Sequence, residues 1–261
     1  MTPKRRRLEV RTARRPHRVG AMLVGWGGNN GATLTAALLA NRLGLSWQTR
    51  EGERRADWLG SLTQSGTLKV GDGDDGREVW VPLNAVVPMV DPDDVEVDGW
   101  DISSLDLEEA TRRNRVLDVD LQRVLAPHLR DLRPRPASFA GHFVAANQQE
   151  RADNVLPGTR AQQLRQLRED IRDFKQRKSL DQVVVVWTAN TERFSDLRPG
   201  LNDTADNLMA AIERDDDEVS SSTLYAVAAI LEGVSTCECM RVHASTVELS
   251  PSYCLFNRAR P

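Results

Sequence analysis

Short apolar runs alternate along the chain with helix-like hydrophobic spacing. Val19–Val24 and the β-branched run 183–187 are continuously apolar, as strands buried on both faces of a parallel sheet must be. The segment 95–101 predicts a further core strand, which ends in an acid. Apolar residues three or four positions apart predict helices between the strands. We expect these helices over 32–43, 107–116, 119–132, around 164–174, from about 203 and over 223–231.

Two of the predicted helices carry further detail. Leu34, Ala37 and Leu38 share one face of the first helix, which predicts their burial. The helix around 164–174 has apolar residues in 3-4-3 spacing, which favours packing on a sheet. A coiled-coil partner site is the alternative, but two heptads are too few for it. Asn202 is the expected N-cap of the helix that follows it.

Alternating strands and helices predict an α/β fold, a Rossmann-like doubly wound parallel sheet. The stretch 44–94 interrupts this alternation and is expected to be an insertion. Within it, 67–70 and 78–83 flank a loop rich in glycine and aspartate, which predicts a hairpin.

Three regions differ in composition. Residues 1–18 form a basic arm; a targeting address or a nucleic-acid arm is conceivable, but a solvated, disordered terminus is the simpler interpretation. Residues 19–233 are expected to form the Rossmann-like domain. Residues 234–261 are expected to be a divergent tail without a strand. This tail holds all three cysteines, and a body without cysteine suits a cytoplasmic protein.

Overall composition excludes several classes of function. The chain has 261 residues, 40% of them hydrophobic and 28% charged, which is enough for a sizeable core. The net charge of −3 gives no reason to expect nucleic acid or an acidic membrane as a partner. No apolar run approaches the ~18 residues of a membrane span, and no secretory signal is expected.

Neither a metal site nor a catalytic site can be assigned from the residues. The acid run 215–218 is expected to be a solvated loop, because four successive side chains cannot converge on one ion. Cys237 and Cys239 are spaced more tightly than common zinc ligands. The four histidines are scattered, and no serine lies in a Gly-x-Ser-x-Gly elbow.

The strongest signal for chemistry is the run 25–31 (GWGGNNG), which follows a predicted strand and opens a predicted helix. Gly25 permits a tight turn, and Gly27 and Gly28 let a pyrophosphate approach the backbone. Backbone N–H groups and the positive end of the helix would bind its charge. The spacing departs from G-x-G-x-x-G because Asn30 stands where a glycine is usual, so a plain glycine-rich turn is the alternative.

Two further features lie where a dinucleotide needs polar groups. An acid that ends the next core strand binds a ribose in such folds; Asp101 is the candidate and Asp98 its rival. Residues 188–191 directly follow the β-branched run, at the end of the strand where ligands of open α/β sheets bind. A turn residue and a simple loop are the respective alternatives.

Six segments, in this order and spacing, resemble inositol-3-phosphate synthase. They are 25–31, 61–64, 98–103, 146–154, 187–194 and 200–205, and the resemblance extends over about 11–233. It implies NAD bound in a Rossmann-like domain. By matching position, the residues implied to contact NAD are Gly27, Gly28, Asn29, Asn30, Asp101, Ser138, Gln148, Arg151, Thr188, Ala189, Asn190 and Thr191.

The resemblance also implies an activity, that of an isomerase of inositol and phospholipid biosynthesis. Family enzymes convert glucose 6-phosphate to inositol 3-phosphate with NAD as hydride carrier, and the family implies a homo-oligomer. Their catalytic cations come largely from lysines in a later segment. The resemblance implies a strand and an Asn-Gly-Ser-Pro-Gln segment after Gly233, but residues 234–261 match neither. Lys175 and Lys178 match no catalytic position of the family.

We therefore expect NAD binding without a complete set of catalytic residues. A non-catalytic truncated isoform that binds NAD or pairs with full-length subunits is the alternative. A third hypothesis is a chain that does not fold stably, because truncation would leave apolar strand edges and helix faces without partners.

Overall fold

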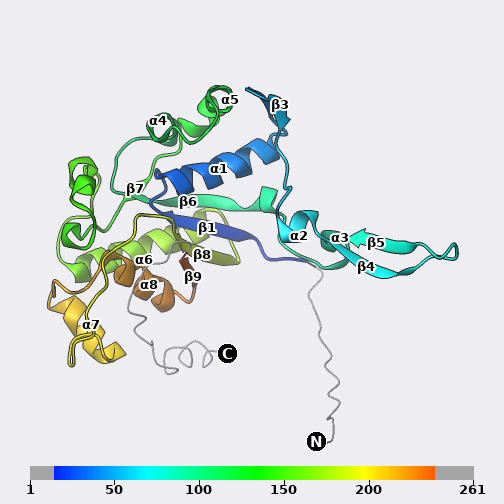
Figure 1. Cartoon of the computed structure of the whole chain (residues 1–261). Coiled ribbons are helices and arrows are strands. Elements are labelled where there is room, and N and C mark those ends of the chain that lie inside the picture. Colours follow the sequence, from blue (N-terminus) through cyan, green and yellow to red (C-terminus); the bar gives the residue numbers. More distant parts are fainter. Residues whose placement is uncertain (1–14, 239–261) are drawn as a thin grey trace, which may run out of the picture.

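A five-stranded parallel sheet forms the centre of the protein (Figure 1). The computed structural model describes residues 15–238, so most of the predicted basic arm and most of the predicted tail lie outside the described residues. The strands run in the order β7-β6-β1-β8-β9. Their bounds are β1 Val19–Val24, β6 Glu96–Asp101, β7 Arg135–Pro136, β8 Gln182–Trp187 and β9 Ser235–Glu238. This confirms the predicted α/β, doubly wound parallel sheet.

Helices cover both faces of this sheet. One face carries α1 (Asn29–Arg42), α4 (Leu107–Asn114) and α5 (Val119–Leu129), and the other carries α6 (Arg160–Arg177), α7 (Ala205–Glu213) and α8 (Ser221–Leu231). Side chains alternate along a strand, so Leu23 of β1 packs toward α1 while Met22 and Val24 pack toward α6. Within the described residues, no helix combines the length and apolar character needed to cross a bilayer.

The predicted helices occur, with bounds that differ by a few residues and with corrections of detail. The buried apolar face of α6 is confirmed. Leu34 of α1 is 37% exposed, because the helix turns Ala32 and Ala36 toward the sheet instead. α5 ends at Leu129 rather than at residue 132. The N-cap of α7 is Thr204 and not Asn202, whose buried side chain closes the preceding loop instead.

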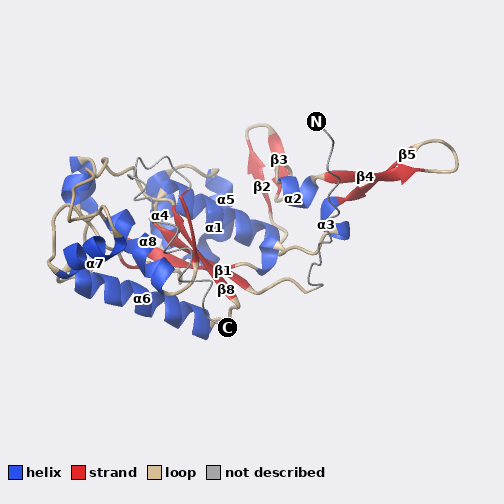
Figure 2. Ribbon diagram, turned by 90° about the horizontal axis from the view of Figure 1, so that it is seen from below, coloured by secondary structure: helices blue, strands red, loops and turns tan. Residues whose placement is uncertain are grey.

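Two antiparallel hairpins fill the predicted insertion between α1 and β6. Their strands are β2 (Ser46–Thr49) with β3 (Gly52–Arg55) and β4 (Thr67–Asp72) with β5 (Glu78–Pro82). The predicted hairpin is β4–β5, and Figure 2 shows it extending away from the sheet and its helices. Short helical turns complete the connections: α2 (Leu62–Ser65), α3 (Leu83–Val86), η1 (Pro92–Asp94), η2 (Gly141–Phe143) and η3 (Ala146–Arg151).

Strand β9 contradicts the prediction that no strand follows Gly233. Ser235–Glu238 pairs in parallel with β8, from Val184 to Trp187. The four residues carry no strong strand signal of their own, but they satisfy backbone groups along an edge of β8 that would otherwise stay unpaired. Cys237 in this strand is exposed and unbridged. The boundary after Gly233 itself stays a prediction.

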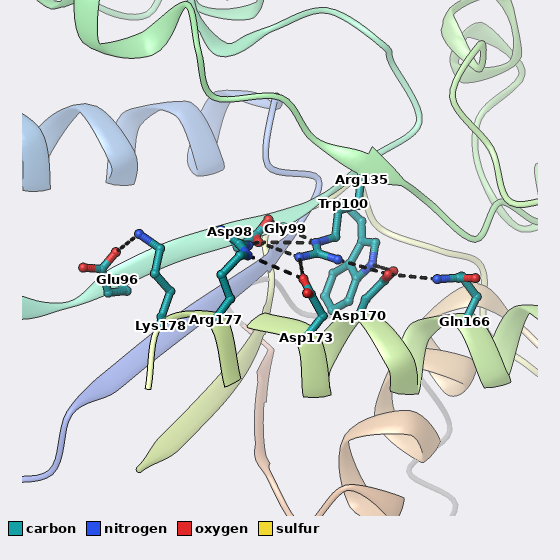
Figure 3. Close-up of polar contacts among 10 residues, drawn as sticks. All are labelled: Glu96, Asp98, Gly99, Trp100, Arg135, Gln166, Asp170, Asp173, Arg177 and Lys178. Carbon is teal, nitrogen blue, oxygen red and sulfur yellow. Dashed lines mark hydrogen bonds and ion pairs between the residues drawn. The ribbon is translucent and has the colours of Figure 1, made fainter. Parts of the chain in front are cut away.

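A network of charged side chains joins β6, β7 and α6 (Figure 3). Arg135 of β7 binds Asp98 at 3.0 Å and Asp170 at 3.2 Å, and it also contacts Asp173. Arg177 reaches the same Asp98 carboxylate at 2.6 Å. These arginines anchor the short β7 strand, and with it the segment that follows, to the α6 side of the sheet.

Candidate functional site

A cavity of about 420 Å³ opens where β1, β6 and β8 end. The chain runs from β1 to β6 on one side and returns to β8 on the other, so the strand order reverses here. Open α/β sheets bind ligands at such a switch point. Ten predicted contact residues line the cavity: Gly28, Asn29, Asn30, Asp101, Ser138, Gln148, Arg151, Thr188, Ala189 and Asn190. Gly27 and Thr191 are not among the lining residues.

The glycine loop between β1 and α1 packs closely against neighbouring backbone. Gly25 has φ +82°, and its N–H donates to the carbonyl of Trp100 at 2.8 Å. A Cβ on Gly25 would lie 2.7 Å from Cα of Ala189 in the loop after β8. A Cβ on Gly31 would lie 2.5 Å from the carbonyl oxygen of Trp26. Glycine at 25 therefore lets the loops after β1 and β8 meet, and glycine at 31 lets α1 start directly against the turn.

Replacing Gly25 with alanine is expected to destabilise the fold by roughly 1–3 kcal/mol more than the same change at Gly44, because the added Cβ overlaps its neighbours. Both glycines have positive φ, but a Cβ on Gly44 would meet nothing within 4 Å. Gly44→Ala therefore reports the cost of the left-handed backbone alone. Urea denaturation of the two variants measures the difference, and equal losses would show that the close approach to Ala189 is unimportant.

Gly27 is held by the protein itself rather than being free for a ligand. Its N–H donates to Oδ2 of Asp101 at 2.8 Å. Its carbonyl accepts from Arg113 at 2.9 Å and from Asn114 at 3.0 Å. These bonds fix the two peptide groups on either side of Gly27, and the N-terminus of α1 lines the cavity. That helix end has no side-chain cap and no acid in its first turn.

Asp101 connects the glycine loop to the cavity. It is 2% exposed, and besides the Gly27 amide it accepts from the Ser103 N–H at 2.9 Å. Nη2 of Arg151 lies 3.6 Å from its Oδ1. Burial raises the pKa of Asp101, and the Ser103 hydrogen bond and the arginine oppose that rise. A carboxylate has about four acceptor positions, so Asp101 can still accept hydroxyl donors from a ligand.

The rival acid Asp98 lies on the other face of β6. Residues 98 and 101 are three positions apart in a strand, so their side chains point to opposite faces. Asp98 is committed to Arg135 and Arg177 and does not line the cavity. The strand geometry therefore brings Asp101, and not Asp98, to the glycine loop.

The loops after β7 and β8 form the remaining walls of the cavity. Several of their polar side chains form hydrogen bonds with other groups of the protein. The Thr188 hydroxyl donates to the carbonyl of Val24 at 2.8 Å, which ties β8 to β1. The Ser138 hydroxyl donates to Gln163 at 2.9 Å. By contrast, Nε of Arg151 is buried without a hydrogen-bond partner in the protein. Arg151 is thus the cation that lines the cavity within the described part of the chain.

Sequence reasoning missed two polar residues that line the cavity, Glu192 and Ser221. Glu192 is 4% exposed and accepts from the N–H and the hydroxyl of Ser222 at the start of α8. The Ser221 hydroxyl accepts from the N–H of Ala140 at 3.0 Å. An acid five residues past the end of a strand was the available signal, but its partner Ser222 lies 30 residues further along the chain.

The chemistry of the site fits a dinucleotide better than a metal ion. An uncapped helix N-terminus and Arg151 suit a pyrophosphate, and Asp101 suits a ribose. Across residues 15–238, no group of three or more His, Cys, Asp or Glu side chains could hold a metal ion.

The comparison with protein families identifies the family of the chain. A model of an NAD-binding domain, described as Myo-inositol-1-phosphate synthase, matches residues 19–240. The chain belongs to the myo-inositol-1-phosphate synthase family. NAD is the cofactor that this family match supports. The match ends at residue 240, close to the predicted end of the resemblance near Gly233.

Relatives of this synthase family are similar over nearly all of the chain. The human inositol-3-phosphate synthase 1 is 61% identical over 231 residues, which are 88% of this chain and 41% of that protein. The Drosophila melanogaster inositol-3-phosphate synthase is 53% identical with the same coverage. The crystal structure of the Caenorhabditis elegans enzyme superposes with a TM-score of 0.85 at 40% identity, covering 92% of this chain and 48% of that one. The chain thus spans about two-fifths of the length of these curated relatives.

Low pH is expected to destabilise the ion pair between Arg193 and Glu218. The guanidinium of Arg193 bonds to Glu218 at 2.9 Å and lowers the pKa of that buried carboxyl to about 2. A depressed pKa contributes stability that is complete above the ordinary value near 4.5 and is lost as the pH falls toward 2. Glu218→Gln should therefore cost roughly 1–3 kcal/mol at pH 7 and progressively less below pH 4. Urea denaturation across this range measures the loss, and a cost that does not change with pH would contradict the assignment.

Proposed function

We propose that the chain holds NAD in this cavity as part of an inositol-3-phosphate synthase, which converts glucose 6-phosphate to inositol 3-phosphate. When bound, NAD would supply the hydride acceptor and donor of that reaction. The observation that carries the proposal is the uncapped N-terminus of α1, which faces the same cavity as the carboxylate of Asp101. The family match supports the cofactor, and this geometry supports the residues assigned to it.

The pyrophosphate would lie against the first-turn N–H groups of α1. Asn29 and Asn30 supply those groups, and Arg151 supplies positive charge from the opposite wall. The hydroxyl groups of the adenosine ribose would donate hydrogen bonds to the carboxylate of Asp101. Gly27, which we predicted as a direct contact, would act by holding the loop, since its N–H and carbonyl are both bound within the protein.

The nicotinamide half would extend across the end of β8. A dinucleotide spans the switch point, so a pyrophosphate at α1 and an adenosine at β6 leave the opposite side for nicotinamide. Thr188, Ala189 and Asn190 line that side. Thr191 remains a predicted contact although it does not line the cavity.

Conversion of glucose 6-phosphate would need groups beyond those that line the cavity. Aldol chemistry on a sugar phosphate requires cations beside the developing negative charge. Within the described residues no lysine lines the cavity, and Lys178 is paired with Glu96 at 2.8 Å beside the α6 face. We therefore expect these 261 residues to bind NAD without converting the sugar. Pairing with full-length subunits and a cytoplasmic location stay predictions.

Thermal unfolding of the purified chain with and without NAD tests the binding proposal. Ligand at 100 times its dissociation constant should stabilise the fold by about 2.7 kcal/mol, which raises the midpoint by several degrees. An unchanged midpoint at millimolar NAD would contradict it. Inositol 3-phosphate formation from glucose 6-phosphate, assayed in parallel, would overturn the expectation of inactivity.

A further inference from the structure

Glu192 is a buried carboxylate in the cavity that has no cation paired with it. Within the described residues it forms no ion pair, and it accepts hydrogen bonds from Ser222, from the N–H at 3.2 Å and from the hydroxyl at 2.5 Å. Its chain neighbour Arg193 is paired with Glu218 at 2.9 Å. Burial raises the pKa of Glu192, and hydrogen bonds from Ser222 and its two preceding serines offset this only in part. Such a carboxylate is stabilised by any positive charge that enters the cavity.

The charged groups around Glu192 leave that role open to a ligand. Asp101 lies across the cavity, where Arg151 already faces it at 3.6 Å. Tyr225 of α8 is fully buried, and burial raises its pKa, so it stays neutral. The first turn of α8 contributes serines and no charged side chain. None of these neighbours forms an ion pair with Glu192.

Position relates Glu192 to the nicotinamide half of the cofactor. Asp101 ends β6 on one side of β1, and Glu192 follows β8 on the other side. With the adenosine ribose on Asp101 and the pyrophosphate at α1, the nicotinamide half extends toward Glu192. The nicotinamide ring carries a positive charge in NAD⁺ and none in NADH.

We propose that Glu192 makes the cavity prefer NAD⁺ over NADH, as a specificity-determining residue for the redox state of the cofactor. This inference rests on the proposed binding of NAD. A carboxylate near a unit positive charge in a partly buried site favours the charged form on the order of tenfold. For a two-electron couple, a tenfold preference lowers the reduction potential of the bound cofactor by about 30 mV. The bound cofactor would then give up its hydride more readily than the free cofactor does.

Equilibrium titrations of NAD⁺, NADH and ADP-ribose into the wild-type chain and Glu192→Gln test this. Glutamine keeps the shape and the acceptor oxygen but removes the charge. At pH 8 we expect wild type to bind NAD⁺ more tightly than NADH. Glu192→Gln should reduce that preference about tenfold. It should leave the affinity for ADP-ribose unchanged, because ADP-ribose lacks the nicotinamide.

Two further carboxylate-to-amide variants serve as matched controls. Glu150→Gln removes an exposed charge outside the cavity lining and should leave the NAD⁺ to NADH ratio unchanged. Asp101→Asn should weaken both redox forms by the same factor, because it acts on the adenosine side. A change of the ratio in Asp101→Asn as large as that in Glu192→Gln would overturn the assignment to Glu192.

The outcomes separate this inference from the proposed function. A folded Glu192→Gln variant with the wild-type ratio would overturn the inference and leave NAD binding intact. Wild-type protein that binds NADH as tightly as NAD⁺ would also overturn it, and this measurement holds even if the variant fails to fold. A chain that binds none of the three ligands would overturn both proposals.

Discussion

Arg135→Met is expected to lower the free energy of unfolding by about 3–5 kcal/mol. Arg135 is the shared partner of Asp98, Asp170 and Asp173, and the first two are buried (Figure 3). Without the guanidinium, carboxylates inside the fold lose their countercharge. Arg177 compensates only at Asp98 and Asp173. Urea denaturation at pH 7 measures the loss.

Arg112→Met is the matched control for this prediction. Arg112 also forms an ion pair, with Glu108 at 2.7 Å, but its side chain is 67% exposed. Exposed pairs of this kind are worth about 0.3–0.5 kcal/mol on a helix. Similar losses in the two variants would mean that burial of the aspartates around Arg135 does not matter.

Asp101→Asn is expected to raise the dissociation constant for NAD about 100-fold. The carboxylate accepts hydrogen bonds from the N–H groups of Gly27 and Ser103, and Asp101 lines the cavity. An amide offers one oxygen in place of two and presents donors to at least one of these N–H groups. The variant therefore loses charged hydrogen bonds to the ribose and also loosens the glycine loop. Isothermal titration calorimetry measures the change.

Asp98→Asn separates binding from stability. Asp98 lies on the same strand and is also buried, but it faces Arg135 instead of the cavity. This variant should unfold at lower urea concentration than wild type, while its folded form binds NAD with the wild-type dissociation constant. Loss of NAD affinity as large as that of Asp101→Asn would mean that the two faces of β6 are not functionally distinct.

The parts of the fold that the sequence predicts well are those whose signals are local. The strand Val19–Val24, the glycine turn after it and the amphipathic helix α6 each carry their pattern within a few residues. The choice between Asp98 and Asp101 was also within reach, because strand alternation places residues three apart on opposite faces. Ten of the twelve predicted contact residues lie together around one cavity, and Asp101 is among them.

Features that depend on distant partners were missed. The N–H of Gly27 is taken by a carboxylate 74 positions away, so its direct role could not be judged from the motif. Glu192 becomes notable only when α8 brings Ser222 beside it. Strand β9 exists because β8 offers it an edge, and its own four residues are weakly patterned. Each of these features requires the sheet to be assembled first.

A crystal structure of the chain with NAD tests the central claim most directly. We expect one NAD in the cavity, with the pyrophosphate at the N-terminus of α1, the adenosine ribose on Asp101 and the nicotinamide toward Glu192. The same cavity left empty at saturating NAD, or a cofactor bound with its ends reversed, would contradict the account.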